Sequence, residues 1–232
     1  MRQKHFILYF ILFFIPLTGI PQNPKITLED IWVKGTFRPN YFMGVNWMKD
    51  NNFFTRIDYN PITNTANIIK SNIQSGESSV LVEGITLVPE GSDEPIQFDD
   101  YSFSPDERKL LISTETESIY RRSYKTHYYL YDLSSRKLTK LTKTNEKQAY
   151  ATFSSDGQKV AFVRDNNLFY IDLKSNEEIQ VTSDGKTNVI INGSTDWVYE
   201  EEFEFTRAFF WSPDSKYIAF YQFDESGVKE YT

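Results

Sequence analysis

Phe209-Phe-Trp-Ser-Pro-Asp-Ser-Lys-Tyr-Ile-Ala-Phe220 is the stretch that decides the fold, because its pattern occurs three times in the chain. The other copies are Tyr101-Ser-Phe-Ser-Pro-Asp-Glu-Arg-Lys-Leu-Leu-Ile112 and Ala151-Thr-Phe-Ser-Ser-Asp-Gly-Gln-Lys-Val-Ala-Phe162. Each copy runs from an aromatic residue through a Ser-Pro-Asp-like turn and a few polar residues to an apolar strand. Pro, Asp and Asp-Gly suit tight connections, so each copy predicts two antiparallel strands joined by a turn.

The copies recur at a nearly constant spacing. A degraded copy, Asn46-Trp47-Met-Lys-Asp50-Asn-Asn-Phe53, precedes these three, so Phe209–Phe220 is the fourth copy in chain order. The anchoring aromatic residues are separated by 56, 50 and 58 residues, and they are Trp47, Phe103, Phe153 and Trp211. Self-similarity at a period of about 50 residues is typical of β-propeller blades rather than of a β-sandwich.

The segments between the copies supply the remaining strands of each blade. Ser123–Leu133 and Lys137–Thr142 read as one hairpin, and Asn167–Leu173 with Glu178–Thr182 reads as a second. An aromatic content of 16% also favours β-structure. We therefore predict an all-β chain built of four-stranded antiparallel propeller blades.

About four blade units fit into residues 40–232. Known propellers close with about four to eight blades, and an open one leaves sheet edges unpaired. We expect residues 40–232 to be a partial propeller domain at the front of a longer protein, preceded by a lead-in segment at 23–39. Closure as a four-bladed propeller is the alternative.

Residues 1–22 have the pattern of a signal peptide. Arg2 and Lys4 precede the ten-residue apolar run Phe6–Ile15. A signal peptide combines a basic start with such a short apolar core, whereas a membrane span needs roughly 20 apolar residues. We expect export to the periplasm or cell envelope with cleavage near Gly19–Gln22. A retained membrane anchor is the alternative.

Charge and composition argue against several classes of function. The net charge is −7, and removal of Arg2 and Lys4 with the signal peptide makes it about −9. Nucleic-acid binding needs clustered Lys and Arg, so we expect no nucleic-acid partner. The chain has no cysteine, and its two histidines are His5, in the signal segment, and His127, in a predicted strand. A zinc site or a Ser-His-Asp triad is therefore not expected, and no cofactor is implied.

The interval before the last copy is the longest and contains Asp196-Trp197-Val198-Tyr199-Glu200-Glu201-Glu202-Phe203. Adjacent residues of a strand point to opposite faces, whereas a helical turn places neighbours about 100° apart. We predict a short helical turn with Asp196 as its N-cap, in which two carboxylates converge on one cation. A solvated acidic turn is the alternative.

The chain resembles the dipeptidyl peptidase IV family, especially exported enzymes of Bacteroidetes-type bacteria. The motifs that carry the resemblance are Gly193–Phe203, Trp211-Ser-Pro-Asp214 and Tyr120-Arg121-Arg122-Ser123-Tyr124. It covers essentially everything after the signal segment. It implies an eight-bladed propeller above a C-terminal α/β-hydrolase domain, and release of dipeptides with Pro or Ala in the second position.

The resemblance also implies the site residues. Glu201 and Glu202 would bind the free α-ammonium of a peptide substrate, and Arg121 would reach the carbonyl oxygen of its penultimate N-terminal residue. Supporting roles fall to Asp196, Trp197 and Tyr199, of which the two aromatic residues are expected to hold the turn by packing. We interpret Glu200 as structural or solvent-facing and Arg122 as a surface charge.

No Gly-x-Ser-x-Gly elbow occurs in the chain. We therefore expect no catalytic residue here and no hydrolysis by this chain alone, with the hydrolase domain as its missing partner. A homodimer is a further expectation from the family. The alternatives are a non-catalytic propeller module that binds peptides or proteins, and an anchored scaffold.

Overall fold

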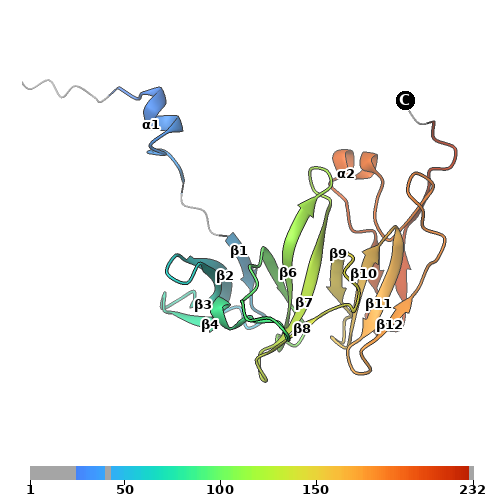
Figure 1. Ribbon diagram of the computed structural model, residues 1–232, viewed down its shortest axis with the longest axis horizontal. Coiled ribbons are helices and arrows are strands. Elements are labelled where there is room, and N and C mark those ends of the chain that lie inside the picture. Colours follow the sequence, from blue (N-terminus) through green and yellow to red (C-terminus); the bar gives the residue numbers. More distant parts are fainter. Residues whose placement is uncertain (1–24, 40–42, 230–232) are drawn as a thin grey trace, which may run out of the picture. The chain divides into compact units, whose positions relative to one another are not determined.

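The computed structural model describes residues 25–39 and 43–229 (Figure 1). The chain divides into two compact units, Met1–Tyr41 and Phe42–Thr232, which are described separately. The predicted signal peptide, residues 1–22, lies outside the described residues. Among the residues described, no helix is both long and apolar enough to cross a membrane.

The described residues of the first unit, 25–39, contain one short helix, α1 (Leu28–Trp32). Thr27 is its N-cap and forms a capping box with Asp30: the Asp30 N–H donates to Thr27 Oγ1 at 3.1 Å, and the Thr27 N–H donates to the Asp30 carboxylate at 3.0 Å. None of its helical residues is buried. Local capping is therefore what the structure shows stabilising this helix.

Residues 43–229, the described part of the second unit, contain three four-stranded antiparallel sheets, each with its strands in chain order. The first sheet comprises β1 (Met43–Trp47), β2 (Phe53–Asn60), β3 (Thr65–Asn72) and β4 (Ser78–Val82), and the short helix η1 (Gly84–Thr86) follows it. The second comprises β5 (Asp100–Phe103), β6 (Lys109–Ser118), β7 (Tyr124–Asp132) and β8 (Lys137–Lys140). The third comprises β9 (Ala149–Phe153), β10 (Lys159–Arg164), β11 (Asn167–Asp172) and β12 (Glu177–Gln180). The predicted blade pattern and both predicted hairpins are confirmed.

The fourth copy forms a different arrangement. Among the described strands, β14 (Phe209–Trp211) pairs only with β15 (Ile218–Phe220), and β16 (Gln222–Asp224) pairs with β13 (Ile190–Asn192). The helix α2 (Trp197–Phe203) lies between β13 and β14 in the chain. Within residues 43–229 the last copy is thus two two-stranded ribbons rather than a four-stranded sheet.

The turns repeat in their hydrogen bonds as well as in their sequence. In each Ser-x-Asp turn the serine hydroxyl donates to the aspartate carboxylate at 2.6 Å, in the pairs Ser104–Asp106, Ser154–Asp156 and Ser212–Asp214. The same hydroxyl accepts an N–H at 2.9 to 3.0 Å from the first residue of the next strand, Lys109 or Lys159, or from the residue just before it, Tyr217. The turns of the last two copies also contact each other, since the Asp156 N–H donates to Ser215 Oγ at 2.9 Å.

Each sheet packs on the next through alternate residues of its central strands. On β6, Leu110 and Ile112 belong to the core shared with the first sheet, whereas Leu111 belongs to the core shared with the third. On β10, Phe162 faces the second sheet, and Val163 packs with Phe209 of the fourth copy. This is the period-two alternation of a sheet that is buried on both faces.

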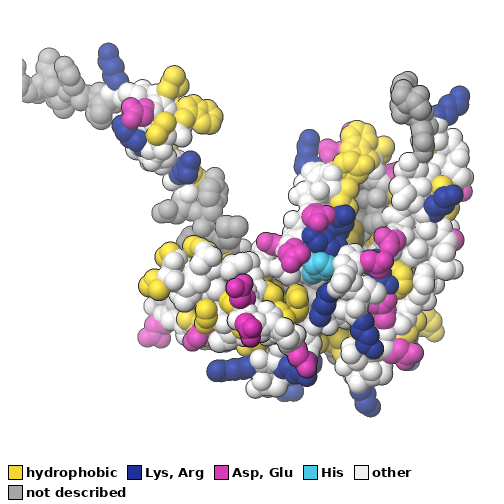
Figure 2. All heavy atoms as spheres, viewed as in Figure 1, with side chains coloured by type: hydrophobic (Ala, Val, Ile, Leu, Met, Phe, Trp, Pro, Cys, Tyr) yellow, Lys and Arg dark blue, Asp and Glu magenta, His cyan; other side chains and the backbone are white. Residues whose placement is uncertain are grey.

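The first strands of all four copies line one cavity of about 860 Å³, which includes Trp47, Tyr101, Phe153 and Phe210. This arrangement is the one expected of propeller blades, whose first strands surround a central channel. On the face drawn in Figure 2, charged side chains of both signs are interspersed.

Candidate functional site

The first half of the site is the arm of the second sheet, formed by residues 115–126 at the joined ends of β6 and β7. β6 and β7 pair regularly up to Thr114 and His127, then an irregularity occurs around Glu115, which has a positive φ of 56°. Pairing resumes at Glu117 opposite Lys125. The arm ends in the tip 119–123, which includes Arg121.

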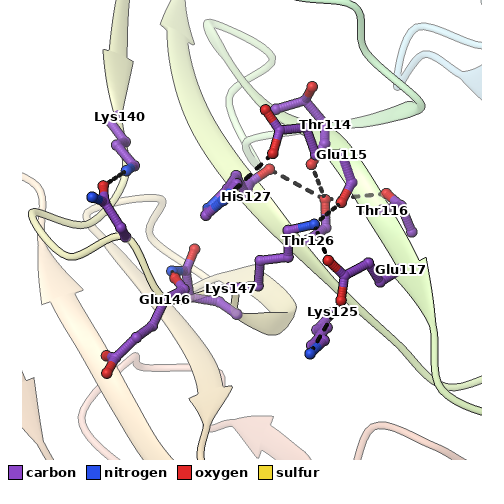
Figure 3. Close-up of polar contacts among 12 residues, drawn as sticks. Thr114, Glu115, Thr116, Glu117, Lys125, Thr126, His127, Lys140, Glu146 and Lys147 are labelled. Carbon is purple, nitrogen blue, oxygen red and sulfur yellow. Dashed lines mark hydrogen bonds and ion pairs between the residues drawn. The ribbon is translucent and has the colours of Figure 1, made fainter.

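The base of this arm is fixed to the third sheet. Thr126 is fully buried, and its N–H and C=O groups both bond the backbone of Gln148 at 2.8 Å. The Lys147 ammonium lies 2.7 Å from the carboxylate of Glu117, which also pairs with Lys125 at 3.1 Å (Figure 3). Hydrogen bonds from the two lysines lower the pKa of Glu117. These contacts fix the orientation of the arm relative to the third sheet.

The helix α2 forms the second half of the site. Asp196 is its N-cap, as predicted, and its carboxylate accepts the Tyr199 N–H at 2.9 Å. Glu204 ends the helix in a left-handed conformation with φ of 54°. The segment entering the helix pairs with the segment leaving it, through a bridge between Ser194 and Arg207. The predicted short helical turn is therefore confirmed. It lies at the end of a stalk made by the two bridged segments, 193–196 and 204–208.

The arm tip and α2 meet (Figure 1). Arg121 Nη2 lies 3.4 Å from Glu201 Oε2. The Arg121 side chain is 70% exposed, whereas that of Glu201 is only 17% exposed. Glu202 is exposed and has no ion pair among the described residues. The structure thus brings together Arg121 and Glu201, with Glu202 next in the helix.

The two aromatic residues assigned supporting roles differ. Tyr199 packs against Phe203 and Phe223, with ring centroids 5.2 and 4.9 Å apart. Trp197 is 56% exposed and has no aromatic ring contact within residues 43–229. Tyr199 therefore has the packing contacts that were expected of both.

The interpretation of Arg122 as a surface charge is wrong. Its Nη2 atom lies 2.8 Å from Glu204 Oε1, and its Nη1 atom donates to the Glu200 carbonyl oxygen at 3.2 Å. Glu200 is 3% exposed, which agrees with the structural half of its interpretation. The sequence gives no local signal for these contacts, because the partners are 78 and 82 residues apart.

The cavity borders this site at the segment that leaves α2. Glu204, Phe205 and Arg207 line the cavity, whereas Arg121 and Glu201 do not. No group of three or more His, Cys, Asp or Glu side chains in the described part of the chain could hold a metal ion. What the site offers chemically is carboxylate and guanidinium groups, which suit binding of charged and polar groups of a ligand.

Comparison with known proteins identifies the family. Residues 104–232 match the model for the dipeptidyl peptidase IV (DPP IV) N-terminal region. Bovine dipeptidyl peptidase 4 is 33% identical over 203 residues, which are 87% of this chain and 25% of that protein. Dipeptidyl aminopeptidase B of Saccharomyces cerevisiae is 32% identical over 203 residues, covering 84% of this chain and 24% of its own length.

The structural comparison agrees. The crystal structure of Porphyromonas gingivalis dipeptidyl peptidase 4 matches with a TM-score of 0.78 and 36% identity, over 89% of this chain and 28% of that one. The chain thus spans about a quarter of the length of the curated relatives it matches. Its sheets are part of a β-propeller, and the chain belongs to the dipeptidyl peptidase IV family, in its N-terminal region.

Proposed function

We propose that this chain is the substrate-binding part of a dipeptidyl peptidase IV-like serine exopeptidase that releases N-terminal X-Pro or X-Ala dipeptides. The observation that carries the proposal is the meeting of Arg121 with Glu201, 3.4 Å apart, from two separate elements. Both residues belong to motifs whose resemblance to the dipeptidyl peptidase IV family implies a role in substrate binding.

The charges and exposures fit the binding of a peptide N-terminus. Glu201 and Glu202 would receive the α-ammonium through charge-assisted hydrogen bonds, which are stronger than neutral ones. Arg121 would turn to a carbonyl oxygen of the bound dipeptide. Its present ion pair with Glu201 involves a guanidinium that is 70% exposed, and such pairs contribute only about 0–1 kcal/mol. Substrate can therefore replace this pair at little cost.

The cleavage chemistry would come from a hydrolase domain outside this chain. No Gly-x-Ser-x-Gly elbow occurs in the 232 residues. A substrate ammonium held at a fixed distance from the nucleophile would make the carboxylates a ruler that sets the cut after two residues. We also propose export to the periplasm or cell envelope, on the basis of the basic and apolar pattern of residues 1–22.

The test uses the complete protein and the substrate Gly-Pro-p-nitroanilide. Glu201→Gln and Glu202→Gln should each lower kcat/KM at least about tenfold, because removing one partner of a charge pair costs on the order of 2–5 kcal/mol. Glu177→Gln removes an equally charged, exposed side chain from β12 and should leave kcat/KM unchanged.

An N-acetylated form of the same substrate should be cleaved poorly by the wild type, because it lacks the ammonium. Unchanged kinetics in both glutamine variants would refute the ammonium site. Peptide binding without any turnover by the complete protein would instead favour a non-catalytic propeller module.

A further inference from the structure

The three consecutive glutamates of α2 have different environments. Glu202 is exposed, the Glu201 side chain is 17% exposed, and Glu200 is 3% exposed. The Glu200 side chain is directed at the arm tip between β6 and β7, as its hydrogen bonds show. It is not available to bind a substrate ammonium in the way that Glu201 and Glu202 are.

Glu200 is bonded to the backbone of the arm tip. Its Oε1 atom accepts the N–H of Arg122 at 2.6 Å and the N–H of Ser123 at 2.8 Å. Burial raises the pKa of Glu200, but hydrogen bonds from the Ser123 hydroxyl and from these two N–H groups outweigh it and leave the pKa lowered. The carboxylate is therefore held in its charged form by the tip.

Arg122 completes the connection in the opposite direction. Its guanidinium donates hydrogen bonds to the Glu200 carbonyl oxygen and the Glu204 carboxylate, so the tip is also bonded to the C-terminal end of α2. Arg121 directly precedes Arg122 in the chain. Fixing the Arg122 and Ser123 backbone groups thus fixes where the Arg121 side chain begins, beside Glu201.

We propose that Glu200 is a positioning residue, which locks the β6–β7 tip onto α2 and thereby holds Arg121 beside the substrate-binding carboxylates. This inference rests on the proposed function. A site whose groups lie on two separate elements needs its supporting contacts to keep the geometry, and Glu200 provides the buried one.

The test compares substrates in the complete protein. Glu200→Ala removes the acceptor of two N–H groups and should lower kcat/KM for Gly-Pro-p-nitroanilide at least about tenfold, mainly by raising KM. Labelling of the catalytic serine by a fluorophosphonate, which has no peptide N-terminus, should change less than about twofold. Glu200→Gln keeps an oxygen that accepts both N–H groups and should restore kcat/KM to within about threefold.

A double-mutant cycle shows whether Glu200 acts through Arg121. When Arg121 is already replaced by Ala, Glu200→Ala should lower kcat/KM by less than about a further threefold, because the effects of residues that act through one interaction are not additive. Full additivity would overturn the inference, and so would an equal loss of fluorophosphonate labelling. If Glu200→Ala does not fold, Glu200→Asp, whose carboxylate is too short for both bonds, should show the same selective loss.

Two further comparisons distinguish a general loss of stability, a failure of the proposed function and a failure of the positioning role. Glu178→Gln weakens a structural ion pair with Arg164 on the third sheet, and it should lower Tm without changing kcat/KM. If Glu201→Gln and Glu202→Gln leave activity intact, the proposed function itself fails. If those two variants lose activity while Glu200→Ala keeps it, only the positioning role is wrong.

Discussion

Arg121 and Arg122 are adjacent at the arm tip, but their side chains have different contacts and therefore different roles. The Arg121 side chain is 70% exposed, and its ion pair with Glu201 is 3.4 Å long. Arg122 is 31% exposed and bonds both a carbonyl and a carboxylate of α2. A long, exposed pair is easily exchanged for a ligand, whereas the multiple contacts of Arg122 are suited to holding two elements together.

The serine of each turn is a second case in which one side chain decides a local structure. Its hydroxyl donates to Asp and accepts the first N–H of the next strand, so one group satisfies two partners. Ser154 is fully buried, whereas Ser212 lies in a more exposed turn. Burial should therefore decide how much the same hydrogen bonds contribute.

We predict that Ser154→Ala lowers the free energy of unfolding by about 1–3 kcal/mol, because it leaves the Lys159 N–H without this acceptor in a buried turn. Ser212→Ala makes the same chemical change where water can replace the hydroxyl, and it should cost under about 1 kcal/mol. Urea unfolding of the complete protein followed by tryptophan fluorescence measures both. Equal losses would show that burial of the turn is not what matters.

At the scale of elements, the strands were predictable because their signals are local. Leu110-Leu111-Ile112 sends alternate side chains to two cores, and the turn chemistry marks where each hairpin reverses. The helical turn was predictable for the same reason, since Asp196 caps it through a bond to a residue three positions away. The joining of the arm tip to α2 was not, because it depends on contacts between residues 78 apart.

Gly193, at the start of the stalk that carries α2, has a backbone conformation and surroundings that suit glycine. Its φ is +77°, a conformation that costs a side-chain-bearing residue roughly 1–2 kcal/mol. A Cβ there would also lie 3.1 Å from Val163 Cγ2 and 3.3 Å from Leu168 Cδ1. Gly76 has a similar φ of +73°, but a Cβ at Gly76 would meet nothing within 4 Å.

Gly193→Ala should therefore destabilise the protein more than Gly76→Ala, which carries the conformational cost alone. We expect about 1 kcal/mol for Gly76→Ala and about 2–3 kcal/mol for Gly193→Ala, once overpacking of the core is added. Because Gly193 supports the helix, its variant should also raise KM for a free N-terminal substrate. Equal Tm shifts for the two variants would mean that Val163 and Leu168 yield without cost.

For the whole molecule, the fourth copy marks the limit of prediction from the sequence. Its aromatic residue, Ser-Pro-Asp turn and apolar strand are as clear as in the other copies, and β14 and β15 do pair as predicted. The pattern does not reveal that β16 leaves this hairpin and pairs with β13. That pairing joins residues far apart in the chain, as does the neighbouring bond from the Gly193 N–H to the Tyr221 carbonyl oxygen at 3.0 Å.

The fourth copy also exposes aromatic side chains. Exposed fractions are 72% for Tyr217, 53% for Tyr221 and 46% for Phe210. Two-stranded ribbons with unpaired edges and exposed apolar rings favour association with other chains. The matched part of the chain is about a quarter of the length of its relatives, so further chain is available in them to cover such surfaces.

We predict that residues 23–232 expressed alone self-associate through this surface. Light scattering coupled to size-exclusion chromatography should give a mass above that of one chain, rising with protein concentration. Changing Tyr217 and Tyr221 together to Lys should shift the population toward monomer, because charge opposes edge and apolar contacts. Ile62→Lys is the matched control, since Ile62 is 93% exposed but lies in the β2–β3 turn, and it should leave association unchanged. A monodisperse, cooperatively unfolding monomer at all concentrations would show instead that the two ribbons are stable as they stand.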